Sequence, residues 1–114
     1  MSDETINNDS KNSEIPEGIP SAEDMLKMIF ASMDTKQVCG LMFGVLAEKA
    51  WENMGLKLPF GEKEEKIDLE SAKIAIDTVI FINEKMKCFV SEEETKFAEN
   101  LISNLQINFV QKQK

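Results

Sequence analysis

Few side chains in this sequence have the chemistry that catalysis or metal binding requires. Histidine is absent, and all 13 basic residues are lysines. The sequence therefore lacks the usual general base near neutral pH and the commonest metal ligand. It also lacks the guanidinium fork that binds carboxylate, phosphate and guanine through paired hydrogen bonds. Because we find no catalytic pair, we expect a protein that is not an enzyme and that carries no cofactor and no metal.

Two cysteines and an acidic triplet remain as candidate metal ligands. Cys39 and Cys88 lie far apart in the sequence, and a zinc site built on them would need carboxylate ligands, which structural zinc rarely uses. We interpret both as buried thiols and not as a disulfide. Glu92–Glu94 directly follow Ser91, and carboxylates in a first helical turn are stabilised by the positive end of the helix dipole. The triplet therefore predicts a helix start rather than a cation site.

Asp77 and Trp51 each allow two interpretations. Asp77 lies in an apolar stretch, and Lys73 stands four residues before it, a spacing that predicts an ion pair along a helix. The alternative for Asp77 is a buried or interfacial hydrogen bond. Trp51 is expected to pack in the core, although tryptophan is also enriched at the binding hot spots of protein interfaces.

Gly40 and Gly44 form a G-x-x-x-G motif inside the most apolar stretch of the chain, residues 38–47. A glycine in a helix interior costs about 1 kcal/mol relative to alanine, so two of them need a structural reason. Because the surrounding residues are apolar, we expect both glycines to be buried where another helix approaches closely. That helix belongs either to the same chain or to a second copy.

Composition restricts the range of partners. A net charge of −8 opposes binding to nucleic acid, because such binding is driven largely by the release of cations from phosphates. The apolar stretch has ten residues and is too short for a membrane-spanning helix, which needs about 20. The N-terminus opens with polar and acidic residues and lacks the pattern of a signal peptide. We therefore expect a cytoplasmic protein with no integral membrane segment and no nucleic-acid partner.

The chain is expected to form one all-α domain behind a tail. Residues 1–20 are rich in Asn, Ser, Asp and Glu, and they cannot bury enough apolar surface to offset the entropy of ordering them. We predict a disordered acidic tail over 1–20 and a single helical domain over 21–114. The predicted elements are a three-helix core at about 35–54, 69–87 and 92–111, preceded by a short amphipathic helix at about 22–33.

Start and stop signals support these boundaries. Ser21, Asp68 and Ser91 are favourable N-cap residues, and Ser91 begins a capping box. Gly55 predicts a left-handed residue that ends the second helix. Apolar residues recur at helical spacing in the first, third and fourth helices, which predicts one apolar face on each. The loop at 55–67 is either a short ordered turn or a flexible segment.

The helix at 35–54 differs from the others because its first half is apolar nearly all round. A helix without a polar face must be covered on several sides, and the neighbours within so short a chain cannot easily surround it. A second copy of the chain is the simplest cover. The predicted oligomer interface consists of Val38, Gly40, Leu41, Met42, Gly44 and Val45.

Several small features recur in a fixed order along the chain. They are an apolar helix closing with Ala47, Ala50 and Met54-Gly55, then Asp68-Leu69, Ala72-Lys73, Ile76-Asp77, Glu84-Lys85, Ser91 to Glu94, and Leu105 to Phe109-Val110. In this order and spacing the chain resembles a bacterial family defined only as domain of unknown function 1844. It departs from the family's common residues at Met86-Lys87, Gln106 and Phe109, where Thr-Gly, Arg and Tyr are usual. The resemblance implies a small helical protein of bacterial origin and no particular activity.

The sequence leaves the function unknown, and we consider three classes. The leading one is a non-enzymatic interaction or structural protein that forms a homodimer through the helix at 35–54, with an unidentified protein as a further partner. The second is a peripheral membrane-surface binder that uses the helix at 22–33, although Glu23 and Asp24 outnumber Lys27 and anionic lipids attract basic helices. The third is an enzyme with an unrecognised site, for which no catalytic pair is found.

Overall fold

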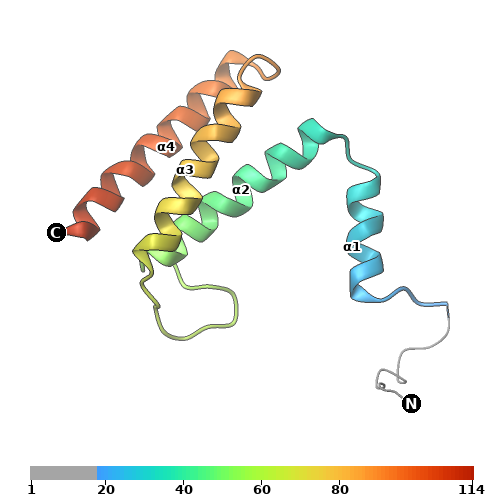
Figure 1. Cartoon of the computed structure of the whole chain (residues 1–114), viewed down its shortest axis with the longest axis horizontal. Coiled ribbons are helices and arrows are strands. Elements are labelled where there is room, and N and C mark those ends of the chain that lie inside the picture. Colours follow the sequence, from blue (N-terminus) through green and yellow to red (C-terminus); the bar gives the residue numbers. More distant parts are fainter. Residues whose placement is uncertain (1–17) are drawn as a thin grey trace. The chain divides into compact units, whose positions relative to one another are not determined.

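Four α-helices make up the regular structure of the described residues. The computed structural model describes residues 18–114 and contains no strand within them. The predicted all-α fold is confirmed, and each helix ends within two residues of its predicted position. The chain divides into two units, Met1–Asp34 and Thr35–Lys114, and the disordered tail predicted for 1–20 falls mainly outside the described residues. The helices are α1 (Ala22–Ala31), α2 (Thr35–Asn53), α3 (Leu69–Met86) and α4 (Glu92–Gln113) (Figure 1).

In the first unit, α1 is a short helix whose two ends are closed by serines. Ser21 Oγ accepts a hydrogen bond from the backbone N–H of Asp24 at 3.1 Å, as expected for an N-cap residue. At the other end, the backbone N–H of Ser32 donates to the carbonyl of Ile29. None of the residues of α1 is buried.

In the second unit, α2, α3 and α4 follow one another as antiparallel helices (Figure 1). The backbone N–H of Asp68 donates to the carbonyl of Asn53 at 2.8 Å, so the end of α2 lies beside the start of α3. At the opposite end, Lys36 Nζ lies 4.4 Å from the centre of the Phe89 ring, so the start of α2 lies near the turn between α3 and α4. α3 packs against both neighbours, whereas α2 and α4 contact each other only over a small region.

Side-chain caps fix where α3 and α4 begin. Asp68 Oδ1 accepts a hydrogen bond from the backbone N–H of Ser71 at 3.1 Å. Ser91 Oγ accepts one from the N–H of Glu94 at 3.1 Å, and the Glu94 carboxylate accepts one in return from the N–H of Ser91 at 2.9 Å. The capping box predicted at Ser91 is therefore confirmed.

Gly55 closes the turn after α2 in the left-handed conformation predicted for it, with a φ of +78°. A Cβ atom there would lie 2.8 Å from Cγ1 of Ile67, so both the backbone and the available space require glycine. An ion pair between Lys57 and Glu48 holds the start of the following loop against α2. The loop at 55–67 is therefore attached at both ends.

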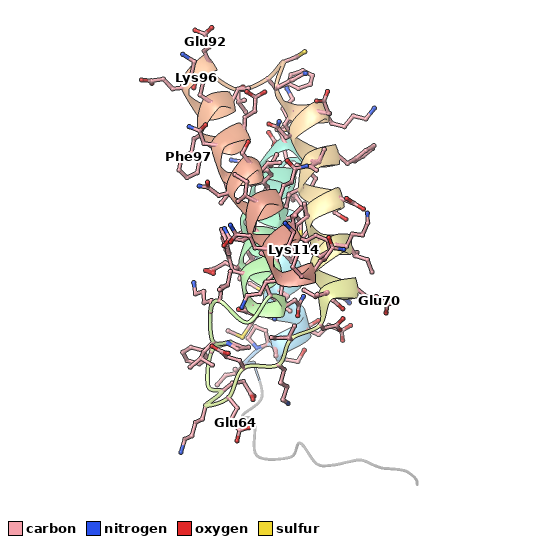
Figure 2. All side chains as sticks on the ribbon, turned by 90° about the vertical axis from the view of Figure 1, so that its left-hand side faces the viewer. Glu64, Glu70, Glu92, Lys96, Phe97 and Lys114 are labelled. Atoms are coloured by element: carbon pink, nitrogen blue, oxygen red, sulfur yellow. The ribbon has the colours of Figure 1, made fainter. Side chains whose placement is uncertain are left out.

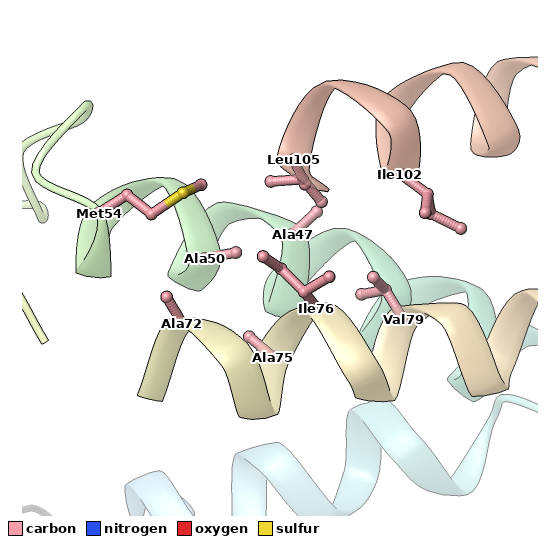
Figure 3. Close-up of a cluster of buried hydrophobic side chains, with 9 residues drawn as sticks. All are labelled: Ala47, Ala50, Met54, Ala72, Ala75, Ile76, Val79, Ile102 and Leu105. Carbon is pink, nitrogen blue, oxygen red and sulfur yellow. The ribbon is translucent and has the colours of Figure 1, made fainter. Parts of the chain in front are cut away.

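The core of the second unit lies where α2 packs on α3, with α4 closing one side. Figure 3 shows Ala72 and Ala75 pointing from α3 toward the turn of α2 that carries Ala50. Alanines allow two helix backbones to approach closely because little side chain separates them. Trp51 is half-buried and packs against this core, as expected. Among the described residues, nine apolar side chains are buried: Ala47, Ala50, Met54, Ala72, Ala75, Ile76, Val79, Ile102 and Leu105.

Candidate interaction surface

The first half of α2 is the region where the sequence predicts an interface. In the structure both of its glycines are exposed, and a Cβ atom added to Gly40 or Gly44 would meet nothing within 4 Å. The expectation that these glycines are buried beneath a neighbouring helix is therefore wrong for a single chain. The close helix approach that was expected there occurs further along α2, at Ala47 and Ala50.

Two larger apolar side chains stand beside the glycines. Leu41 is 41% exposed and Val45 is 42% exposed. Val38 and Met42, the other two residues of the predicted interface, are half-buried at the edge of this area. Residues four apart share a helix face, so the four exposed positions form one continuous outward strip. We call this the glycine strip of α2: Gly40, Leu41, Gly44 and Val45.

Other apolar side chains of the three-helix unit are exposed at separate places. Ile74 and Phe81 lie on α3, and Phe97 projects from α4 (Figure 2). Lys85 Nζ lies 5.3 Å from the centre of the Phe81 ring, so a lysine side chain partly shields that aromatic face. Neither group has glycines beside it that would let a second helix backbone come close.

A groove of about 320 Å³ lies between the first half of α3 and the end of α4. Ile76 and Phe109 line it, and Asp77 accepts a hydrogen bond from Lys73 Nζ at 2.8 Å in the same groove. The predicted ion pair is therefore confirmed, and both of its side chains are more than half exposed. A solvated pair of this kind contributes little to stability. The residues that line the groove include no Ser, Thr or Cys.

The two cysteines are free thiols in different parts of the unit. Cys39 on α2 is half-buried, and Cys88 is exposed in the turn between α3 and α4. The prediction that they form no disulfide is confirmed. The prediction that both are buried is wrong for Cys88, because a residue in a short surface turn has few neighbours to cover it.

The acidic triplet forms the first turn of α4, and Figure 2 shows Glu92 at this N-terminal end of the helix. Hydrogen bonding to Ser91 lowers the pKa of the Glu94 carboxylate below the usual 4.5. The backbone N–H of Ser91 has the larger effect and the Ser91 side chain the smaller one. Among residues 18–114, no three His, Cys, Asp or Glu side chains gather where they could hold a metal ion. Glu94 therefore belongs to the helix cap.

Asn83 is a buried polar residue that the sequence reasoning missed. It is 8% exposed and lines a small pocket of about 90 Å³, together with Phe43 and Met86. Its side-chain amide has no hydrogen-bond partner among the residues that the structure describes. The signal that could have found it is spacing, because Asn83 stands four residues after Val79 and continues the buried stripe of α3.

Comparison with known proteins identifies the family. The family model described as Domain of unknown function (DUF1844) matches residues 40–111, a span that includes the glycine strip and all of α3. This chain therefore belongs to that family, as the resemblance implied. No curated protein and no solved structure matches the chain. None of the helices in the described residues has the length and apolar character that crossing a membrane requires.

Proposed function

We propose that this member of the family is a non-enzymatic protein that associates with a second copy of itself through the glycine strip of α2. The observation that carries the proposal is the open space over Gly40 and Gly44, directly beside the exposed side chains of Leu41 and Val45. Each glycine weakens the helix by about 1 kcal/mol relative to alanine. No contact within the described chain uses the small size of these glycines, whereas a second helix laid on the strip would use it.

The strip is complementary to itself in an antiparallel arrangement. When two α2 helices cross with a two-fold axis between positions 42 and 43, Leu41 lies opposite Gly44 of the partner subunit. In the same register Val45 lies opposite Gly40 of the partner subunit, so each larger side chain meets a glycine. A two-fold contact of this kind repeats every pairing twice. Burying the exposed parts of the four larger side chains gives roughly 3 kcal/mol, which corresponds to a dissociation constant in the millimolar range, so we expect a dimer that forms only at high concentration and dissociates on dilution.

The small core of the three-helix unit also supports association. Four of its nine buried apolar residues are alanines, and the largest fully buried side chains are Met54, Val79 and Leu105. A domain of this size is marginally stable by itself. Association with a second copy stabilises the folded chain by mass action, because the unfolded chain does not present the strip.

The groove between α3 and α4 supports the non-enzymatic part of the proposal. Its acidic and basic groups, Asp77 and Lys73, are paired with each other and are more than half exposed. Catalytic acids and bases usually stand in a cleft that removes them from water. A small molecule retained through purification, detected by mass spectrometry of the denatured protein, would contradict this part.

Disulfide trapping between copies tests the strip and its orientation. One full-length variant carries Leu41→Cys and the other carries Gly44→Cys, both with Cys39→Ser and Cys88→Ser. Because the two positions face each other across the proposed axis, the mixture is expected to form a trapped dimer under mild oxidation that neither variant forms to the same extent alone. Mass spectrometry of the joined peptides measures the pairing.

A matched control uses an exposed residue outside the strip. Ile74 on α3 is 66% exposed, so Ile74→Cys in the same background offers at least as accessible a thiol. This control is expected to give no more than the background of chance collisions. Equal trapping at Ile74 and at the strip would contradict the proposal.

A further inference from the structure

We infer that α1 is a docking helix, recognised by an apolar groove bordered by Lys or Arg on a different protein. This inference goes beyond self-association and concerns another part of the chain. It combines the exposure of the apolar side chains of α1 with the charge of the segment that carries them.

The apolar side chains of α1 are spaced for recognition by a groove. Leu26 and Ile29 are 55% and 54% exposed, although they stand in the middle of a helix. Phe30 belongs to the same face and is half-buried, as is Met33, which follows two residues after the end of α1. Together the four follow the i, i+3, i+4, i+7 pattern by which an amphipathic helix places its anchors in a groove. No residue of α1 is buried.

The helix is short but well prepared for binding. Its 10 residues span about 15 Å, a length at which an isolated helix is only marginally stable in water. The caps at Ser21 and Ser32 and the ion pair between Glu23 and Lys27 favour the helical form. A partner that binds the helical form therefore meets a reduced ordering cost.

Charge selects the class of partner. The segment Met1–Asp34 contains eight acidic residues and two lysines, so it carries −6 of the net −8. An anionic membrane surface attracts basic helices and repels a segment of this sign. A second copy also fits poorly, because Thr35–Lys114 contains 13 acidic residues against 11 lysines and has no excess positive charge. A groove bordered by Lys or Arg on another protein complements both the apolar face and the charge.

Site-specific photocrosslinking in the cells that naturally make the protein tests this inference. The full-length chain carries benzoylphenylalanine in place of Ile29, on the apolar face, or in place of Lys27 as the matched control on the polar face. We expect the Ile29 position to join one protein other than this chain, with the linked peptide in an apolar groove that Lys or Arg borders. When Glu23→Lys and Asp24→Lys are combined with the Ile29 probe, the yield of this crosslinked adduct is expected to fall roughly fivefold or more.

Four results would overturn the inference. Two concern the adduct at Ile29: no adduct specific to this position, or an adduct that joins two copies of this chain. The third is a crosslinking yield that does not change when the charge is reversed. The fourth is flotation of the purified protein with phosphatidylglycerol vesicles. Circular dichroism of each variant checks that the three-helix unit is intact, which is expected because the substitutions lie in the other unit. The native mass of the Glu23→Lys, Asp24→Lys variant separates the outcomes, because self-association through α2 would not change when docking through α1 fails.

Discussion

The two halves of α2 both carry small residues at helical spacing, yet only the small residues of the second half are covered. Ala47 and Ala50 in the second half are buried against α3, where Figure 3 shows the two helices close together. Gly40 and Gly44 in the first half have open space where a side chain would begin. The comparison teaches that small residues on a helix indicate where another helix can pack closely. They do not indicate whether that helix belongs to the same chain or to another one. In the alanine half the neighbour is part of the same chain, and in the glycine half we propose that it is a second copy.

Enlarging one residue in each half should give the largest contrast. Ala50 is completely buried, so Ala50→Leu is expected to push α2 away from α3 and to lower the free energy of unfolding by about 1–3 kcal/mol. Gly44→Leu adds a side chain where nothing lies within 4 Å and introduces a better helix former, so the dilute protein should lose no stability. Urea unfolding followed by circular dichroism measures both. Equal losses at the two positions would contradict the difference between the halves.

Replacing both glycines by alanine should sharpen the comparison further. Gly40→Ala with Gly44→Ala is expected to raise the free energy of unfolding of the dilute protein by about 2 kcal/mol, because each alanine favours the helix by about 1 kcal/mol. The same change is expected to weaken self-association, since two methyl groups then separate the paired helices. Opposite signs for the two measurements are the distinctive result. A variant that is both more stable and more tightly associated would contradict the proposed contact.

The core contains one buried polar side chain, and replacing it with an apolar one should increase the stability of the fold. Asn83 is buried, and its side-chain amide has no hydrogen-bond partner among residues 18–114, so its burial costs free energy. Asn83→Leu is therefore expected to raise the free energy of unfolding by about 1 kcal/mol. Chemical denaturation measures this change, and Thr78→Leu on the same helix is a half-buried control for helix propensity. A loss of stability in Asn83→Leu alone would mean that the amide is satisfied by a bound molecule.

Acid sensitivity should give the smallest effect, and it concerns the helix starts that align the covered region. Hydrogen bonds from Ser71 lower the pKa of Asp68, and those from Ser91 lower the pKa of Glu94. A carboxylate with a lowered pKa in the folded state stabilises the fold above its usual pKa, and this contribution is lost as the pH falls through the folded value. Thermal stability should therefore decline between about pH 5 and pH 2, and less so in Glu94→Gln. An identical acid profile in that variant would contradict the role of the cap.

Most of the fold could be predicted from the sequence because its signals are local. Ser91 and Glu94 meet within one helical turn, and Gly55 is required by its own backbone conformation, with a φ of +78°. Apolar spacing likewise identifies one face of α3 and α4, because residues three and four apart always share a face. Such signals depend on neighbours in the sequence and not on the packing of distant elements.

The candidate site was harder to predict because burial depends on distant elements. Gly40 and Gly44 stand among apolar residues and are exposed, whereas Ala47 and Ala50 stand beside Glu48 and Lys49 and are buried, so local apolar character does not identify which half of α2 meets α3. Asn83 was missed because its polar side chain hides its place in a buried stripe. The exposure of Cys88 depends on the short turn around it, which periodicity does not describe.

The most direct test of the central claim is the native mass of the full chain, measured by light scattering across a dilution series. The wild type is expected to move from twice the chain mass of 12.9 kDa at high concentration toward a single chain on dilution. Leu41→Asp should remain a folded single chain throughout, because it places a charge in the strip, whereas Ile74→Asp, at a more exposed site outside the strip, should follow the wild type. A wild type that stays a single chain at every concentration, or a Leu41→Asp variant that dimerises as the wild type does, would contradict the account.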